Sequence, residues 1–256
     1  MLWQMGLGLP WAWRVGRADS SERDHLLTLL DDTPADSLPV MDAGYSGYRL
    51  LSAIADSGRC FLIRASRSVR LLSDLGYAEP VDEQTVWLWP ERAQRDRQPP
   101  LVLRLIRLPG AVERRRKVYL LTNVRDPARL SDEQASVLYR MRWGVELGYR
   151  SLKQTLERRK LRSHAPAQAL FEIHGPILGL MLLGLMTVAA ILEAGGDPLG
   201  WSVAAALRVV RQGVRHRRSI DWTAALRAAT SRCVRQGAAL PRPPSRRPPI
   251  PPLFRR

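Results

Sequence analysis

Residues 131–163 constrain the fold most, because this stretch combines a helix start signal with two distinct side-chain stripes. Ser131 followed by Gln134 is typical of a capping box, which marks the start of a helix. No proline follows until after Ser163, so the pattern predicts one long helix. Apolar side chains recur at helical spacing and should pack against a core. This apolar stripe consists of Leu138, Met141, Val145, Tyr149, Leu152 and Leu156.

A polar stripe lies beside the apolar one. It consists of Tyr139, Arg142, Glu146, Arg150, Lys153 and Glu157. On a helix these positions fall within about a quarter of the circumference, so Glu146 should have cations on both sides and a phenol nearby. Taken alone, such a stripe is more typical of a solvated helix face with surface ion pairs.

The spacing Tyr139-x2-Arg142-x3-Glu146-x6-Lys153 resembles the signature of DDE transposases of the insertion-sequence-four type. Trp143 lies inside the motif, and a basic run continues it. The resemblance implies that Glu146 is the last catalytic acid and that Tyr139, Arg142 and Lys153 grip phosphates of the transposon ends. The other DNA-binding candidates along the stretch are Arg150, Arg158, Arg159 and Lys160.

A second acid follows a short apolar segment near the amino-terminal end of the chain. Residues 38–41 are typical of a buried strand, and Asp42 comes directly after them. By position, Asp42 could line a site at the end of the strand or cap the next helix. The sequence Asp42-Ala43-Gly44-Tyr45 is similar to the context of the second catalytic Asp in the same family. The resemblance therefore implies that Asp42 is catalytic.

Charge indicates an anionic partner. The chain has 256 residues, with 40 Lys and Arg against 24 Asp and Glu, which gives a net charge of +16. Nearly all of these cations are arginines, which bind phosphate in bidentate fashion, so nucleic acid is favoured over a membrane surface. The only cysteines are Cys60 and Cys233, so neither a disulfide framework nor a zinc cluster is expected, and a reduced cytosolic compartment fits.

One apolar run, residues 177–192, resembles a membrane segment in composition. It follows Pro176 and is shorter than the ~20 residues that span a bilayer, so we predict a buried helix under the catalytic domain and no membrane partner. Residues 1–13 are apolar but lack a basic leader, and we expect no signal peptide.

The rest of the chain predicts alternating elements. Residues 2–16 should form one strand that enters a loop, Ser21 should cap a short helix, and residues 48–58 should form a helix before a strand at 60–64. Short β-like runs follow at 69–72, 85–90, 101–108 and 118–124. Carboxy-terminal to the break at 195–198 we expect a basic amphipathic helix over 201–218, which could contact DNA or simply be solvated.

These patterns and the resemblance predict an α/β fold: a ribonuclease-H-like mixed sheet flanked by helices, with a β-rich insertion, a helical carboxy-terminal part and the first strands missing. The expected regions are a truncated core, the insertion, the helices with the signature, a basic helical region and a disordered Pro/Arg-rich tail. Their bounds are 1–65, 66–130, 131–194, 195–240 and 241–256.

The resemblance implies metal-dependent cleavage and strand transfer at double-stranded transposon ends, with Asp42 and Glu146 helping to hold two Mg²⁺ or Mn²⁺ ions. The first catalytic acid has no counterpart, because the upstream aspartates are typical of helix ends and loops: Asp19, Asp24, Asp31, Asp32 and Asp36. We therefore expect an amino-terminally truncated transposase, inactive alone, that works as a homodimer or with a chain supplying the first strand. It should lie in the bacterial cytoplasm with the nucleoid.

Two other functions remain open. The chain could be a non-catalytic DNA-binding remnant of a decayed transposase, whose arginines bind phosphates without reading sequence. A metal-dependent hydrolase is the weakest of the three, because two acids without a nearby third ligand make a poor divalent site.

Overall fold

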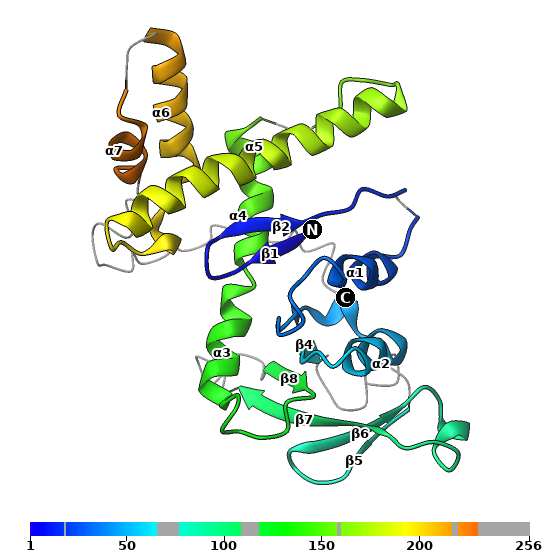
Figure 1. Cartoon of the computed structure of the whole chain (residues 1–256). Helices are drawn as coiled ribbons and strands as arrows, with labels where there is room; N and C mark the ends of the chain where they lie inside the picture. Colours follow the sequence, from blue (N-terminus) through cyan, green and yellow to red (C-terminus); the bar gives the residue numbers. More distant parts are fainter. Residues whose placement is uncertain (18, 66–76, 109–117, 158–159, 217–219, 230–256) are drawn as a thin grey trace, which may run out of the picture. The chain divides into compact units, whose positions relative to one another are not determined.

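The computed structural model describes residues 1–17, 19–65, 77–108, 118–157, 160–216 and 220–229 (Figure 1). It contains two compact units, Met1–Met181 and Leu182–Arg256. The first unit carries the sheet and both predicted acids, and the second is helical.

The first unit is built on a mixed six-stranded sheet in the order β3-β4-β8-β7-β6-β5. β3 runs parallel to β4, and every other neighbouring pair is antiparallel. The strands are β3 (Val40–Met41), β4 (Leu62–Ala65), β5 (Tyr77–Pro80), β6 (Thr85–Trp89), β7 (Leu101–Leu108) and β8 (Val118–Thr122). This mixed sheet with flanking helices confirms the predicted fold class.

Helices cover both faces of the sheet because its central strands are apolar on both sides. On one face Ile63, Leu105 and Leu121 pack with α1 (Glu22–Leu30) and α2 (Tyr48–Asp56). On the other face of the sheet, the residues next to these three in the sequence pack with α3 (Asp132–Met141). Those neighbours are Leu62, Ile106 and Leu120. The period of two along each strand thus produces a three-layer arrangement.

The predicted β-rich runs are strands of this same sheet. The runs at 85–90, 101–108 and 118–124 correspond to β6, β7 and β8, whereas the run at 69–72 lies outside the described residues. β8 pairs with β4 on one side and with β7 on the other, so these strands extend the sheet that holds β3. The division of the chain into five regions stays a prediction.

The amino-terminal segment differs from the single strand that we predicted. It forms a hairpin of β1 (Leu2–Gln4) and β2 (Leu9–Ala12), in which Trp3 lies opposite Pro10. Gly8 makes the reversal possible, because its φ of 67° suits a residue without a side chain and its N–H donates to the Gln4 carbonyl at 2.9 Å. After the hairpin, Ser21 caps α1 as predicted, accepting a hydrogen bond from the Asp24 N–H.

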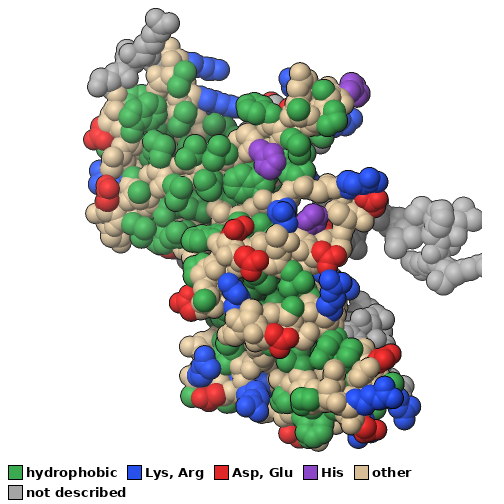
Figure 2. Space-filling model, turned by 45° about the vertical axis from the view of Figure 1, so that its right-hand side comes forward, with side chains coloured by type: hydrophobic (Ala, Val, Ile, Leu, Met, Phe, Trp, Pro, Cys, Tyr) green, Lys and Arg blue, Asp and Glu red, His purple; other side chains and the backbone are tan. Residues whose placement is uncertain are grey.

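The apolar helix α5 (Pro166–Glu193) is longer than predicted and less buried. It does not begin after Pro176 but continues through it, since one proline removes a single hydrogen bond from a long helix. Only 44% of its most apolar window is buried, and Figure 2 shows hydrophobic side chains gathered on the surface where α5 runs. By length and a mean hydropathy of 2.2 alone, α5 could cross a membrane, a test that core helices of soluble proteins also pass.

The second unit joins the end of α5 to two shorter helices. These are α6 (Val203–His216) and α7 (Trp222–Arg227), which follow the short turn η5 (Pro198–Gly200). Gly195, with a φ of 70°, forms the predicted break after α5. The core of this unit consists of Leu183, Ala190, Ala206, Leu226 and Ala229.

Candidate active site

The signature stretch is not the one long helix that we predicted. α3 ends at Met141, α4 covers Gly144–Arg150, and a π-helical turn, η4, covers Ser151–Thr155. At the first break the N–H of Glu146 donates to the Trp143 carbonyl at 3.2 Å, three residues back, so the helix tightens locally. The helical stretch ends well before Ser163, because Glu157 adopts a φ of 57°.

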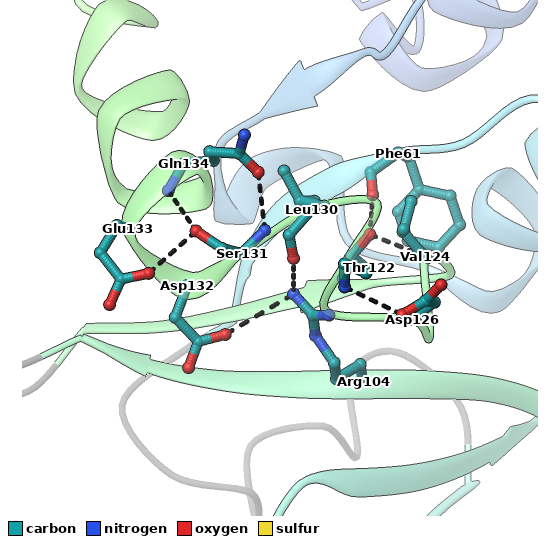
Figure 3. Close-up of polar contacts among 11 residues, drawn as sticks. Phe61, Arg104, Thr122, Val124, Asp126, Leu130, Ser131, Asp132, Glu133 and Gln134 are labelled. Atoms are coloured by element: carbon teal, nitrogen blue, oxygen red, sulfur yellow. Dashed lines mark hydrogen bonds and ion pairs between the residues drawn. The ribbon is translucent and has the colours of Figure 1, made fainter.

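The start of α3 is fixed firmly to the sheet (Figure 3). The predicted capping box is present, since Ser131 Oγ accepts from the Gln134 N–H and the Ser131 N–H donates to Gln134 Oε1 at 2.8 Å. Arg104 on β7 is only 6% exposed; it donates to the Leu130 carbonyl and lies 3.6 Å from the Asp132 carboxylate. The signature stretch therefore begins from a fixed point on the sheet.

Asp42 caps a turn, which is one of the two interpretations of its position, and that it lines a site stays a prediction. It follows β3 at the edge of the sheet and caps the short turn η1 (Ala43–Tyr45), where its Oδ1 accepts from the Gly44 N–H at 2.9 Å. Its other oxygen, Oδ2, lies 3.9 Å from Nη1 of Arg142. One oxygen thus holds the local backbone, and the other faces the signature residues.

Arg142 brings the two predicted acids together. Its Nη2 donates to Glu146 Oε1 at 3.2 Å, while its Nη1 faces Asp42. The Arg142 side chain is 17% exposed, whereas those of Asp42 and Glu146 are 46% and 39% exposed. The guanidinium also lies over the Tyr139 ring, 5.5 Å from its centroid. Four of the predicted site residues therefore form one cluster, the Asp42–Tyr139–Arg142–Glu146 cluster.

Two polar atoms of this cluster are buried without a hydrogen-bond partner among the described residues: the Tyr139 hydroxyl and Nε of Arg142. An unpaired buried polar group costs roughly 1–3 kcal/mol, so such groups usually face a ligand or an ordered water. Both atoms belong to side chains that the motif assigns to phosphate binding.

Helix α1 holds the turn that follows Asp42, which the sequence did not indicate. Arg23 Nε donates to the Gly44 carbonyl at 3.2 Å, and Glu22 lies close enough to Tyr45 to affect its pKa. Burial, followed by the negative charges of Glu22 and Asp42, raises the pKa of Tyr45 to about 12. Burial and the charge of Glu22 also raise the pKa of Tyr149. These phenols therefore stay protonated at neutral pH and can donate hydrogen bonds.

Trp3 also contacts the signature stretch, and the sequence analysis did not identify it. Its indole lies against Gly144 and Gly148, which are one helical turn apart on α4 and flank Glu146 in sequence. A methyl group added at Gly144 would meet Nε1 of Trp3 at 2.9 Å, and one added at Gly148 would meet the six-membered ring more closely still. The two glycines thus form a notch for Trp3 that fixes α4. The spacing of these two glycines, four residues apart in the sequence, was the signal that could have indicated the notch.

The remaining predicted residues are exposed or lie outside the described residues. Arg150, Lys153 and Lys160 are exposed along the continuation of the stretch. Arg158 and Arg159 lie outside the described residues, as does the Pro/Arg-rich tail. Within the described parts of the chain, no three His, Cys, Asp or Glu side chains lie close enough to hold a metal ion together.

Comparison with known proteins gives the family. The family model for the transposase DDE domain matches residues 5–182, which include the whole Asp42–Tyr139–Arg142–Glu146 cluster. The chain belongs to the DDE transposase family. This result confirms the resemblance drawn from the two sequence motifs.

A relative in Escherichia coli strain K12 supports the membership. The chain is 31% identical over 175 residues to the transposase InsG for insertion sequence element IS4. The similarity covers 66% of this chain and 39% of that transposase, so the chain spans about two fifths of the length of this curated relative.

Proposed function

We propose that this DDE transposase chain takes part in DNA transposition and that the Asp42–Tyr139–Arg142–Glu146 cluster is part of its active site. The observation that carries the proposal is the shared guanidinium: Arg142 contacts the acid that follows an edge strand and the acid on the signature helix. Ribonuclease-H-like transposases use acids from these two kinds of element, as the resemblance implies. The cluster therefore joins the expected elements with the expected residue types.

The donor set fits a hard divalent cation. Asp42 Oδ2 and the Glu146 carboxylate are partly exposed oxygens, the ligand type that Mg²⁺ and Mn²⁺ prefer. We propose that these two residues hold the metal and that a complete site binds two ions. When bound, such ions activate the attacking oxygen and stabilise the leaving oxygen of phosphodiester cleavage and strand transfer.

A third carboxylate should come from outside the described residues. Within them the acids that could complete the site are missing, and β3 is the end strand of the sheet. An added strand, parallel to β3 on its outer edge, would place its carboxyl end beside Asp42. We propose that an acid-bearing strand, from this polypeptide or a partner, completes the site there.

Arg142 and Tyr139 should hold the phosphate that reacts. The guanidinium is planar and binds phosphate in bidentate fashion, and its Nε and the Tyr139 hydroxyl have unmet hydrogen bonds. The exposed Arg150, Lys153 and Lys160 continue this basic surface and would track the DNA backbone. The partner that fits is double-stranded DNA at the transposon ends, bound by a homodimer in the bacterial cytoplasm with the nucleoid.

The second candidate function is a DNA-binding remnant without catalysis. The observation that favours it is the absence of a third acid near Asp42 and Glu146 in the described part of the chain. In that case phosphate binding by Arg142 would remain, and metal-dependent chemistry would be lost.

Nicking of the element's terminal DNA in Mn²⁺ tests whether the site is complete in this chain. We would compare the chain with Asp42→Asn and Glu146→Gln, using Asp96→Asn as the control, since Asp96 is an exposed acid on a loop. Nicking by the wild-type chain that both site variants abolish would support catalysis and would contradict the need for a third acid from outside. Nicking that persists in both variants would contradict the proposed site. No nicking by any chain, with salt-sensitive DNA binding that falls when Arg142 and Lys153 are replaced, would support the incomplete site.

A further inference from the structure

The surface of α6 carries an arginine stripe that the candidate active site does not use. Arg208, Arg211 and Arg215 are exposed and fall within about 60° of one another around the helix. The opposite side of α6 packs inward: Ala206 is fully buried, and Gly213 lies against Trp222 of the following segment. This packing fixes which side of α6 faces solvent, so the three guanidinium groups share one exposed side.

The acids nearest in sequence to this stripe already have other roles. No Asp or Glu occurs between Asp197 and Asp221. Asp197 accepts a hydrogen bond from the Leu199 N–H at 2.9 Å, and Asp221 accepts one from the Ala224 N–H at 3.0 Å. A solvated helix face normally mixes both signs of charge, whereas this stripe is positive throughout and forms no ion pair among the described residues.

The length of the stripe matches the phosphate spacing of a nucleic acid. Arg208 and Arg215 are about 10 Å apart along the helix axis at ~1.5 Å per residue. One strand of duplex DNA places a phosphate every ~3.4 Å along its axis, so three cations over this distance can face about three consecutive phosphates. Arginine also suits this partner because its guanidinium forms bidentate hydrogen bonds with phosphate oxygens.

We propose that the Arg208–Arg211–Arg215 stripe of α6 is a second DNA-binding surface, which contacts the duplex backbone without reading sequence. Phosphate contacts position a protein on DNA and carry no base information. The surface needs no metal ion, so the proposal does not depend on the catalytic chemistry above.

Salt-dependent binding of a duplex tests this proposal. Fluorescence anisotropy with a random-sequence duplex, without metal, would compare the wild type with the triple variant R208Q/R211Q/R215Q. The control, R49Q/R97Q/R129Q, removes the same charge from three exposed arginines of the first unit. Each phosphate contact adds about 0.9 to the slope of log K against log salt, so loss of the stripe should reduce the slope by about 2.7.

Other outcomes would overturn the proposal. An unchanged slope in the stripe variant, or an equal loss in the control, would show that α6 makes no special contact. A loss that appears with one duplex sequence and not with another would contradict backbone-only binding. Vesicles with an anionic lipid are the alternative probe. If the stripe variant loses vesicle binding while its DNA salt slope is unchanged, the stripe binds a membrane surface instead of DNA. Circular dichroism melting checks that all variants fold.

Discussion

Asp42 and Glu146 contact the same guanidinium, although one follows the edge strand β3 and the other lies on α4. Arg142 Nη1 lies 3.9 Å from Asp42 Oδ2, and its Nη2 donates to Glu146 Oε1 at 3.2 Å. The positive charge holds the acids together before any metal ion or DNA arrives, and its exposed fraction of 17% limits screening by solvent.

Arg142 should contribute to DNA affinity in a way that lysine cannot fully replace. Arg142→Gln should weaken duplex binding and reduce the salt slope by about one phosphate contact. Arg142→Lys should restore the slope but not the affinity, because a lysine ammonium cannot make the bidentate contact. Anisotropy titrations at several salt concentrations measure both quantities. Arg49→Gln, at an exposed position on α2, is the control, and an equal effect there would contradict the assignment.

The notch for Trp3 should make Gly148 sensitive to a single methyl group. Gly148→Ala places a carbon against the Trp3 ring and should destabilise the chain by roughly 1–3 kcal/mol, the usual cost of overpacking. Urea unfolding measures this loss. The matched control is Gly179→Ala on α5, where an added methyl meets nothing within 4 Å and should stabilise the helix slightly.

The same contact can be tested by a double-mutant cycle. Trp3→Ala should remove most of the penalty of Gly148→Ala, with a coupling of roughly 0.5–3 kcal/mol. Additive effects of the two substitutions would contradict direct packing of Trp3 on α4.

Tyr45 should make the chain less stable at high pH. Its folded pKa is raised to about 12 from 10.0, so the stabilising contribution is complete below pH 10 and is lost as the pH rises towards 12. The sign follows because the unfolded chain releases this proton first. Tyr45→Phe should lose less stability than the wild type across this window, as measured by urea unfolding at each pH. An identical pH dependence in both proteins would contradict the perturbed phenol.

The buried Arg104 should contribute more to stability than Asp132, with which it forms an ion pair. Arg104→Ala leaves the buried Leu130 carbonyl without its charged donor and should cost about 2–3 kcal/mol. Asp132→Asn should cost less than about 1 kcal/mol, because the Asp132 side chain is 52% exposed. Arg104→Met should cost less than Arg104→Ala, because the methionine side chain fills part of the space that alanine would leave empty. Thermal unfolding ranks the three, and equal losses would contradict an anchoring role for Arg104.

Local signals in the sequence predicted the elements well. Ser21 and Ser131 cap their helices as expected, and the runs of apolar residues predicted the central strands of the sheet. These features depend on near neighbours along the chain, which a sequence displays directly. Motif spacing also predicted that Asp42 and Glu146 share a site; both carboxylates lie next to the Arg142 guanidinium, and their catalytic roles stay a prediction.

Features set by tertiary packing could not be predicted. The break between α3 and α4 depends on the tightened turn at Trp143 and on Trp3 seated against Gly144, a contact between distant segments. The hydrogen bond from Arg23 on α1 to the Gly44 carbonyl likewise joins distant segments, and no side-chain pattern indicates it. Pro176 was misleading because a long apolar helix tolerates one missing hydrogen bond.

Mn²⁺ binding in the presence of duplex DNA tests the central claim most directly, since electron paramagnetic resonance counts free Mn²⁺ without requiring cleavage. We predict that DNA increases Mn²⁺ affinity, because phosphate oxygens complete the ligand set, and that Asp42→Asn and Glu146→Gln each weaken binding roughly tenfold or more. Asp96→Asn should bind as the wild type does. Equal Mn²⁺ binding by the wild type and both site variants would contradict a metal site at Asp42 and Glu146.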